Sequence, residues 1–197
     1  KAYLVSKGEY SPENESSFAP ALCNRIDKNT GGIVIAAKNA ESLRILNDKI
    51  KFMEIDKRYL AVIHGVPKQK SQTLEGFLEK NEDKNKVYLS GKKTDNNLTI
   101  KTKYTTLASK GGLSLIEVEL ITGRTHQIRV HMSSIGHPLL GDSVYGPAKS
   151  PYKLQGQTLH AKTIGIIHPR TEEYVEVNAP LPEYFSDLLK KLENSIQ

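Results

Sequence analysis

Hydrophobic and polar residues follow strand-like periods in some stretches of this chain and helix-like periods in others. Residues 32–38 (Gly-Ile-Val-Ile-Ala-Ala-Lys) form an apolar run that predicts a buried strand, and Asn39 is placed to cap a following helix. Residues 58–66 predict another strand, which ends at Pro67 because proline has no backbone N–H to donate. The apolar face of the helix after Asn39 would consist of Leu43, Leu46 and Ile50.

Two pairs of alternating stretches predict β-hairpins. Residues 98–108 and 113–122 are joined around Gly111-Gly112, a dipeptide that suits a tight turn. Residues 158–167 and 173–178 form the second pair, across a Pro-Arg-Thr turn. The stretch from Pro67 to Asn97 is the least regular part of the chain, and its charged centre at residues 80–86 predicts an exposed hairpin tip or loop.

A helix is predicted directly after the first hairpin. Thr125 is placed to cap this helix and Gly136 to end it. At about 100° per residue, His126, Arg129 and Ser133 share one flank of the helix, away from its core stripe. That stripe would consist of Ile128, Met132 and Ile135.

A second amphipathic helix is predicted at the carboxyl end, beginning at Pro182. Its apolar face would consist of Phe185, Leu188, Leu189, Leu192 and Ile196. Hairpins alternating with few helices indicate an α+β fold with mixed or antiparallel sheets.

The composition indicates a single globular domain with a polyanionic partner. The 197 residues suffice for one sizeable core, and a hydrophobic content of 38% is too high for a disordered chain. Lys and Arg number 28 against 22 Asp and Glu, and the resulting charge of +6 favours a partner such as nucleic acid. No apolar run approaches the roughly 18 residues needed to span a bilayer. A single cysteine, Cys23, allows no internal disulfide, so we expect a cytoplasmic protein.

The chain begins at Lys1 rather than at a methionine, which indicates a fragment or a processed chain. We interpret residues 1–17 as a lead-in or the end of a linker. Residues 18–197 are expected to form the single domain.

One unusual stretch is Asn24-Arg25-Ile26-Asp27-Lys28-Asn29-Thr30-Gly31-Gly32. In it an acidic residue lies between two cations, and two glycines follow before the predicted strand. Flanking cations would keep Asp27 ionised, as a nucleophilic carboxylate must be. Residue types alone rather favour an ordinary turn, in which Asp27 caps a backbone N–H and Lys28 is solvated.

A second stretch, residues 120–131, crowds two arginines and two histidines where a strand turns into a helix. Such an end offers backbone N–H groups to an anion, although a solvated basic helix start fits equally well. His126 and His131 diverge by about 140° on a helix and cannot easily share a metal. We therefore expect no metal site and assign both histidines to hydrogen bonds with the backbone or with RNA phosphate.

Together the two stretches resemble the RluA/RluC/RluD-type family of RNA pseudouridine synthases. The family motif H-R-L-D-x-x-T-S-G corresponds to residues 24–32, with Asn24, Ile26 and Gly31 as departures that remove no reactive group. Residues 122–131 match the later motif T-G-R-T-H-Q-I-R-V-H in full. Shorter family pieces follow in order at Lys57-Arg58-Tyr59, Gly136 to Asp142, Tyr145-Gly146, Leu159-His160-Ala161 and His168-Pro169.

The resemblance covers residues 18–189 and implies the pseudouridine synthase fold, a mixed, mainly antiparallel central sheet flanked by helices. It also implies an isomerase that converts uridine in RNA to pseudouridine without a cofactor or metal. Asp27 takes the position of the catalytic carboxylate, which attacks either the ribose anomeric carbon or the uracil ring. Tyr59 corresponds to the tyrosine that stacks on uracil and assists proton removal. Arg129 corresponds to the basic residue that pairs with the catalytic aspartate.

RNA contacts are assigned by the same resemblance and by charge. Arg25 corresponds to the family arginine that fills the RNA stack when the target base leaves it. Arg124, Lys28, His126 and His131 are candidate phosphate contacts. Extruding a base costs a few kcal/mol, so basic contacts near the pocket have a physical purpose.

Two other functions are weighed against the isomerase. A catalytically inactive RNA-binding module of the same fold would usually lack one of Asp27, Tyr59 and Arg129, which are all present. A glycoside or nucleoside hydrolase normally needs two carboxylates around the sugar, and beyond Asp27 only Asp142 is a distant second candidate.

The expected partner is RNA, with large-subunit (23S) ribosomal RNA favoured and transfer RNA left open. We expect no membrane partner and a monomer. Many relatives of the C and D types carry a small N-terminal RNA-binding domain, and we expect that this domain is missing from the chain.

Overall fold

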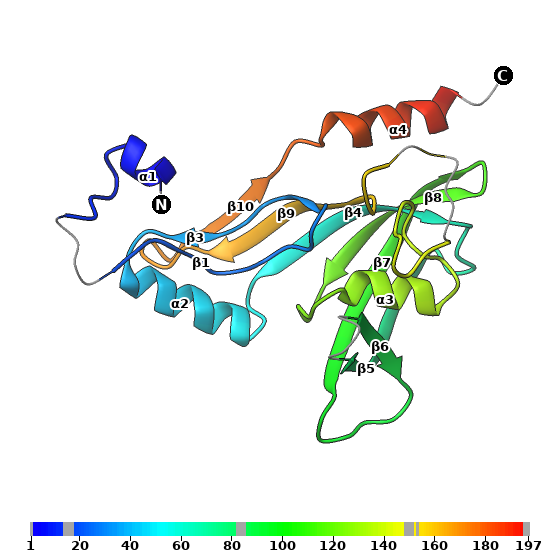
Figure 1. The fold of residues 1–197 in the computed structure, drawn as a ribbon, viewed down its shortest axis with the longest axis horizontal. Helices are drawn as coiled ribbons and strands as arrows, with labels where there is room; N and C mark the ends of the chain where they lie inside the picture. The colour runs from blue at the N-terminus through cyan, green and yellow to red at the C-terminus, as the bar shows by residue number, and fades with distance from the viewer. Residues whose placement is uncertain (1, 14–17, 82–85, 148–151, 153, 195–197) are drawn as a thin grey trace.

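The computed structural model describes residues 2–13, 18–81, 86–147, 152 and 154–194 (Figure 1). Within this part of the chain, one sheet of eight strands has the order β10-β9-β4-β8-β7-β5-β6, and β2 pairs with β9. The pairing of β2 with β9 is parallel and the others are antiparallel. The fold is therefore of the α+β class with a mixed, mainly antiparallel sheet, as the sequence predicts.

Four helices and ten strands are described, and the helices are spread among the strands along the chain. They are α1 (Ala2–Ser6), β1 (Ala21–Leu22), β2 (Gly31–Gly32), β3 (Ala36–Ala37), α2 (Ala40–Lys51), β4 (Asp56–His64), β5 (Ser71–Asn81), β6 (Lys86–Ser90), β7 (Leu98–Lys110), β8 (Leu113–Leu120), α3 (Gln127–Ser134), β9 (Leu159–Ile167), β10 (Tyr174–Asn178) and α4 (Glu183–Asn194). No helix in the described part of the chain is long and apolar enough to cross a membrane.

Both predicted hairpins are confirmed. Strands β7 and β8 pair antiparallel and turn at Gly111 and Gly112, whose φ angles of 58° and 75° a residue with a Cβ rarely adopts. Strands β9 and β10 form the second hairpin. The β9 strand also pairs with β4, with a register shift beside Tyr59. Such an irregularity is common next to functional sites.

The hydrophobic core lies on both faces of the sheet because neighbouring residues of β4 point in opposite directions. On one face, Ala61 and Ile63 of β4 pack with Ile128 and Met132 of α3. On the other face, Val62 packs in a cluster with Phe185 and Leu188 of α4. Helix α3 is thereby fixed directly against the central strands (Figure 1).

Helices α2 and α4 lie close to their predicted places. The Asn39 side chain accepts a hydrogen bond from the Ser42 N–H at 2.8 Å, which confirms the predicted cap of α2. Of the predicted apolar face only Leu46 is buried. Helix α4 begins at Glu183, one residue after Pro182, whereas Ile196 and the side chain of Leu192 lie outside the described residues.

The charged segment at residues 80–86 lies where a hairpin tip is predicted. Strands β5 and β6 pair antiparallel with Asn81 opposite Lys86, and residues 82–85 between them lie outside the described residues.

Two predictions about elements are wrong. Residues 32–38 do not form one buried strand; β2 joins β9 and β3 joins β1, and Val34 between them is exposed. Thr125 does not cap α3: His126 occupies the cap position in a left-handed conformation, without a side-chain cap bond.

Candidate active site

A cavity of about 270 Å³ lies where three segments of the chain meet. Residues 23–27 form one wall, Lys57 and Tyr59 of β4 form another, and the segment from Gly123 into α3 forms a third. Asp27, Tyr59 and Arg129, which are far apart in the sequence, all line this cavity. The structure therefore brings together the three residues to which the resemblance assigns the reaction.

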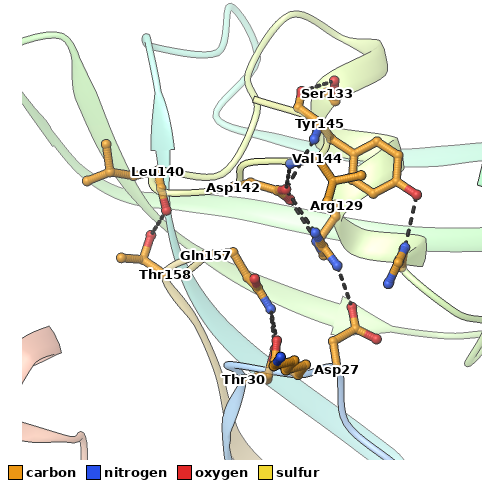
Figure 2. Close-up of polar contacts among 12 residues, drawn as sticks. Asp27, Thr30, Arg129, Ser133, Leu140, Asp142, Val144, Tyr145, Gln157 and Thr158 are labelled. Carbon is orange, nitrogen blue, oxygen red and sulfur yellow. Dashed lines mark hydrogen bonds and ion pairs between the residues drawn. The ribbon is translucent and has the colours of Figure 1, made fainter. Parts of the chain in front are cut away.

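Asp27 lies in the loop between β1 and β2. Hydrogen bonds to backbone groups of this loop hold it in place. Its carbonyl oxygen accepts a hydrogen bond from the Thr30 N–H at 3.0 Å. The buried side chain of Gln157 donates to the Lys28 carbonyl at 2.7 Å and to the Thr30 hydroxyl at 3.0 Å (Figure 2). The loop is thus tied to the segment that precedes β9, while the Asp27 carboxylate itself is left to face the cavity.

Arg129 lies between two carboxylates and bonds them unequally (Figure 2). Its Nε and Nη2 donate to Asp142 Oδ2 and Oδ1 at 2.7 and 2.8 Å, a two-pronged contact of the strongest kind. Its Nη1 lies 3.4 Å from Asp27 Oδ2, in one longer contact. Arg129 is therefore fixed by Asp142 and directed at Asp27.

Asp142 is fully buried, and its carboxylate accepts four hydrogen bonds. Besides Arg129, its Oδ1 accepts the N–H groups of Val144 and Tyr145 at 2.9 and 3.1 Å. Burial by itself would raise the pKa of Asp142, but the hydrogen bonds from Arg129 and the two N–H groups outweigh burial and lower it. Conversely, burial disfavours the Arg129 cation, yet both carboxylates together raise its pKa. The charged forms of Arg129 and Asp142 therefore stabilise each other.

Tyr145 covers the flank of α3 that carries Arg129. The guanidinium of Arg129 lies over the Tyr145 ring, 5.1 Å from its centroid. The Tyr145 hydroxyl lies 2.9 Å from Nδ1 of His126 and accepts the Val87 N–H at 3.1 Å, and Ser133 donates to the Tyr145 carbonyl. The prediction that His126, Arg129 and Ser133 share a flank is confirmed, but residues 142–145 cover this flank.

Tyr59 is buried in the wall of the cavity, with 8% of its surface exposed. Loss of solvation, together with the negative charge of Asp27, raises the pKa of Tyr59 to about 12. At neutral pH the side chain is therefore an uncharged phenol, which offers an aromatic surface and one hydroxyl group.

Two cations, Lys57 and Arg124, also line the cavity. Burial, followed by the neighbouring positive charge of Arg124, lowers the pKa of Lys57. Arg124 is among the residues predicted from the sequence, but Lys57 is not, although it stands two residues before Tyr59 in the lysine-x-tyrosine piece. Asp142 and Tyr145 are also outside the predicted site residues, although they belong to the glycine-aspartate and tyrosine-glycine pieces.

The remaining predicted RNA contacts fall into different environments. Arg25 and Lys28 are exposed, and Arg25 lines the cavity. His126 lines the cavity and is held by Tyr145; burial lowers its pKa, opposed by Asp27. His131 is only 1% exposed, so the prediction that it contacts phosphate is wrong.

The reason for the error is the packing of α3 against β7. The Nδ1 atom of His131 lies 2.8 Å from the hydroxyl of Thr102 on that strand, and burial lowers its pKa to about 4. In the part of the chain that is described, no group of three or more His, Cys, Asp or Glu side chains is placed to hold a metal ion.

Comparison with known proteins gives matches along most of the chain. The family model described as RNA pseudouridylate synthase matches residues 2–134. The uncharacterized RNA pseudouridine synthase YlyB of Bacillus subtilis is 38% identical over 173 residues, which cover 88% of this chain and 56% of that protein. The ribosomal large subunit pseudouridine synthase C of Buchnera aphidicola is 34% identical, over 87% of this chain and 56% of that protein. The chain thus spans about half the length of these curated relatives.

A solved structure shares the fold. Human RNA pseudouridylate synthase domain containing 4 superimposes with a TM-score of 0.75 at 24% identity, over 91% of this chain and 78% of that one. The architecture described above is therefore that of a known fold.

Proposed function

We propose, from the premise that this chain belongs to the RNA pseudouridine synthase family, that it isomerises uridine to pseudouridine in large-subunit ribosomal RNA. The family assignment rests on the match of residues 2–134 and on relatives up to 38% identical. The substrate rests on relatives named ribosomal large subunit pseudouridine synthases C and D, of which this chain spans about half. A charge of +6 suits an RNA partner.

The observation that carries the proposal is the meeting of Asp27 and Arg129 across 102 positions of sequence, in a cavity that Tyr59 lines. A carboxylate that attacks carbon must be ionised and free to move. The one contact between Arg129 and Asp27, at 3.4 Å, leaves the Asp27 carboxylate less constrained than that of Asp142, which Arg129 binds at 2.7 Å.

In the proposed reaction the Asp27 carboxylate attacks either the ribose anomeric carbon or the uracil ring. The bond between uracil nitrogen and the anomeric carbon breaks, and the uracil keeps the electron pair. The base then turns, its carbon five bonds to the anomeric carbon, and Asp27 is released. Carbon five loses its proton and the ring nitrogen gains one, so product and substrate have the same atoms.

Tyr59 supports these reaction steps as a neutral aromatic surface. A uracil ring that has left the RNA stack loses its stacking partners, and an aromatic side chain in the cavity replaces them. Because its pKa is about 12, the Tyr59 phenol is uncharged at neutral pH and adds no negative charge beside Asp27. We assign it stacking on the target base and a hydrogen-bonding role when the carbon-five proton leaves.

The function is tested by release of tritium from RNA labelled at carbon five of uracil, with unmodified large-subunit ribosomal RNA as substrate. Wild type is compared with Asp27→Asn and with Asp187→Asn, which removes an exposed carboxylate on α4. We expect release by wild type and Asp187→Asn and none by Asp27→Asn, with RNA binding retained in all three proteins. Binding without release by wild type, on ribosomal and transfer RNA alike, would contradict the proposal and support an RNA-binding module instead.

A further inference from the structure

The cations that line the cavity differ in their partners. Arg129 is neutralised by Asp27 and Asp142. Arg25, Lys57 and Arg124 also line the cavity, and among the described residues no ion pair joins any of them to a carboxylate. Lys57 and Arg124 lie close enough for the charge of Arg124 to lower the pKa of Lys57, so they form a cationic pair.

Lys57 of this pair is half-buried in the fold, whereas Arg124 is exposed. Lys57 and Tyr59 are two residues apart on β4, so their side chains leave the same face about 7 Å apart along the strand. The Lys57 amine packs against Gly123, where an added Cβ would lie 3.3 Å from Nζ. Arg124 follows directly and brings a second positive charge to the same place.

Lys57 is half-buried, and the nearby positive charge of Arg124 repels its ammonium group, which disfavours the charged amine in the free protein. The lowered pKa of Lys57, caused first by burial and then by Arg124, expresses that cost. An anion bound between Lys57 and Arg124 would offset both the burial of the Lys57 amine and its repulsion by Arg124, because a negative charge attracts both cations. A phosphodiester supplies such an anion, and RNA carries one beside every base.

We propose that Lys57 and Arg124 form a phosphate subsite that binds a phosphodiester adjoining the target uridine while its base lies on Tyr59. The assignment rests on the proposed function and adds to it the orientation of the nucleotide in the cavity. The base and sugar face Asp27 and Arg129, and the backbone leaves past Lys57 and Arg124. This arrangement sets the direction in which the RNA strand crosses the site.

The first test measures RNA binding and does not depend on turnover. Affinity for a large-subunit ribosomal RNA transcript is followed by fluorescence anisotropy at several salt concentrations for wild type, Lys57→Met, Arg124→Met and Lys190→Met. Losing one phosphate contact should lower the slope of log affinity against log salt by about 0.7 to 0.9. We expect this decrease for Lys57→Met and for Arg124→Met.

Lys190→Met is the matched control, since Lys190 is exposed on α4. Arg124 is exposed as well, so Arg124→Met tests the subsite even if Lys57→Met fails to fold. A slope equal to that of wild type for Arg124→Met and for folded Lys57→Met would overturn the phosphate subsite, whether or not the protein is an isomerase.

The second test locates the phosphate. In an RNA fragment that carries the modified uridine, the phosphate on its 5′ or 3′ side is replaced by a neutral methylphosphonate. For wild type, one of the two replacements should lower kcat/KM for tritium release about tenfold, the usual loss for a charged hydrogen bond. The same replacement should have little further effect on Lys57→Met, because the interaction has already been removed. Equal losses in wild type and Lys57→Met would contradict the assignment.

The two tests separate the two proposals. If wild type releases no tritium but the salt slope still falls with Arg124→Met, the isomerase proposal fails and the phosphate subsite stands. If release is normal and neither the slope nor the methylphosphonate effect depends on Lys57 and Arg124, the isomerase stands and the subsite fails.

Discussion

Two carboxylates approach Arg129 from opposite sides, and they are held in different ways. Asp142 is fully buried, binds the guanidinium through both oxygens and accepts two backbone N–H groups. Asp27 keeps 16% of its side chain exposed and makes one contact at 3.4 Å. The same residue type is thus held by several hydrogen bonds on one side and by a single longer contact at the cavity on the other.

Both aspartates pair with Arg129, so an ion pair alone does not tell a supporting carboxylate from a proposed nucleophile. A carboxylate that accepts several hydrogen bonds from fixed donors is a poor nucleophile and a good anchor, whereas one with a single long contact can move toward a substrate. Losing the anchor should therefore cost stability, and losing the reactive group should cost activity. The following changes test that division.

The largest effect is expected for Asp27→Asn on activity. The amide cannot act as the nucleophile, so the rate of tritium release should fall at least about 1,000-fold. The free energy of unfolding in urea should stay within roughly 1 kcal/mol of wild type, because Arg129 keeps Asp142 as its partner. A stable variant with more than a few per cent of wild-type activity would argue against Asp27 as the nucleophile.

Asp142→Asn should show the opposite pattern, with its main effect on stability. The change leaves the buried Arg129 cation without its fixed partner, and breaking such a pair costs about 3–5 kcal/mol. Urea unfolding of this variant beside Asp27→Asn and Asp187→Asn measures the difference. If Asp142→Asn and Asp27→Asn lose the same unfolding free energy, the proposed difference between the two carboxylates is wrong.

The free energy of unfolding should also depend on pH, through His131, which packs on Thr102 of β7. Burial lowers the pKa of His131 from 6.5 to about 4, so the unfolded chain takes up a proton at pH values where the folded chain does not. Stability from this group is present above pH 6.5, is lost as the pH falls, and is gone near pH 4. The loss amounts to about 3 kcal/mol.

Unfolding free energies of wild type and His131→Leu, measured in urea between pH 7 and pH 4, test this dependence. The variant has no group that takes up the proton, so its curve should be flatter by the amount that His131 contributes. Parallel curves for the two proteins would show that His131 is not the source of the pH dependence.

The smallest effect is expected for Tyr145→Phe. The change keeps the ring beneath Arg129 but leaves the Val87 N–H and Nδ1 of His126 without the hydroxyl. We expect a loss of about 1–2 kcal/mol in unfolding free energy, with tritium release close to that of wild type. A large loss of activity at unchanged stability would mean that the Tyr145 hydroxyl takes part in the reaction.

The sequence predicted the parts of the fold that depend on local patterns. The hairpin at Gly111-Gly112 and the cap at Asn39 follow from residue conformation and short-range hydrogen bonds, and both are confirmed. The run at residues 32–38 was misassigned because its length and β-branched residues fit one buried strand, whereas its two ends pair with different strands. Which strands pair depends on the whole fold and is not encoded in seven residues.

The site was predicted only as far as the motifs reached. The pattern of α3 correctly placed His126, Arg129 and Ser133 on one flank, but it could not show that Tyr145 covers this flank. For the same reason His131 was assigned to RNA although it packs on Thr102 of β7. Helical periodicity orders the faces of a helix, and only tertiary packing determines what lies against each face.

The most direct test of the account is to measure tritium release and urea unfolding on the same preparations of Asp27→Asn and Asp142→Asn. The account predicts that Asp27→Asn is as stable as wild type and releases no tritium, whereas Asp142→Asn loses several kcal/mol of stability. Tritium release by stable Asp27→Asn at a rate near that of wild type would contradict it, because Asp27 would then be neither nucleophile nor essential to the site.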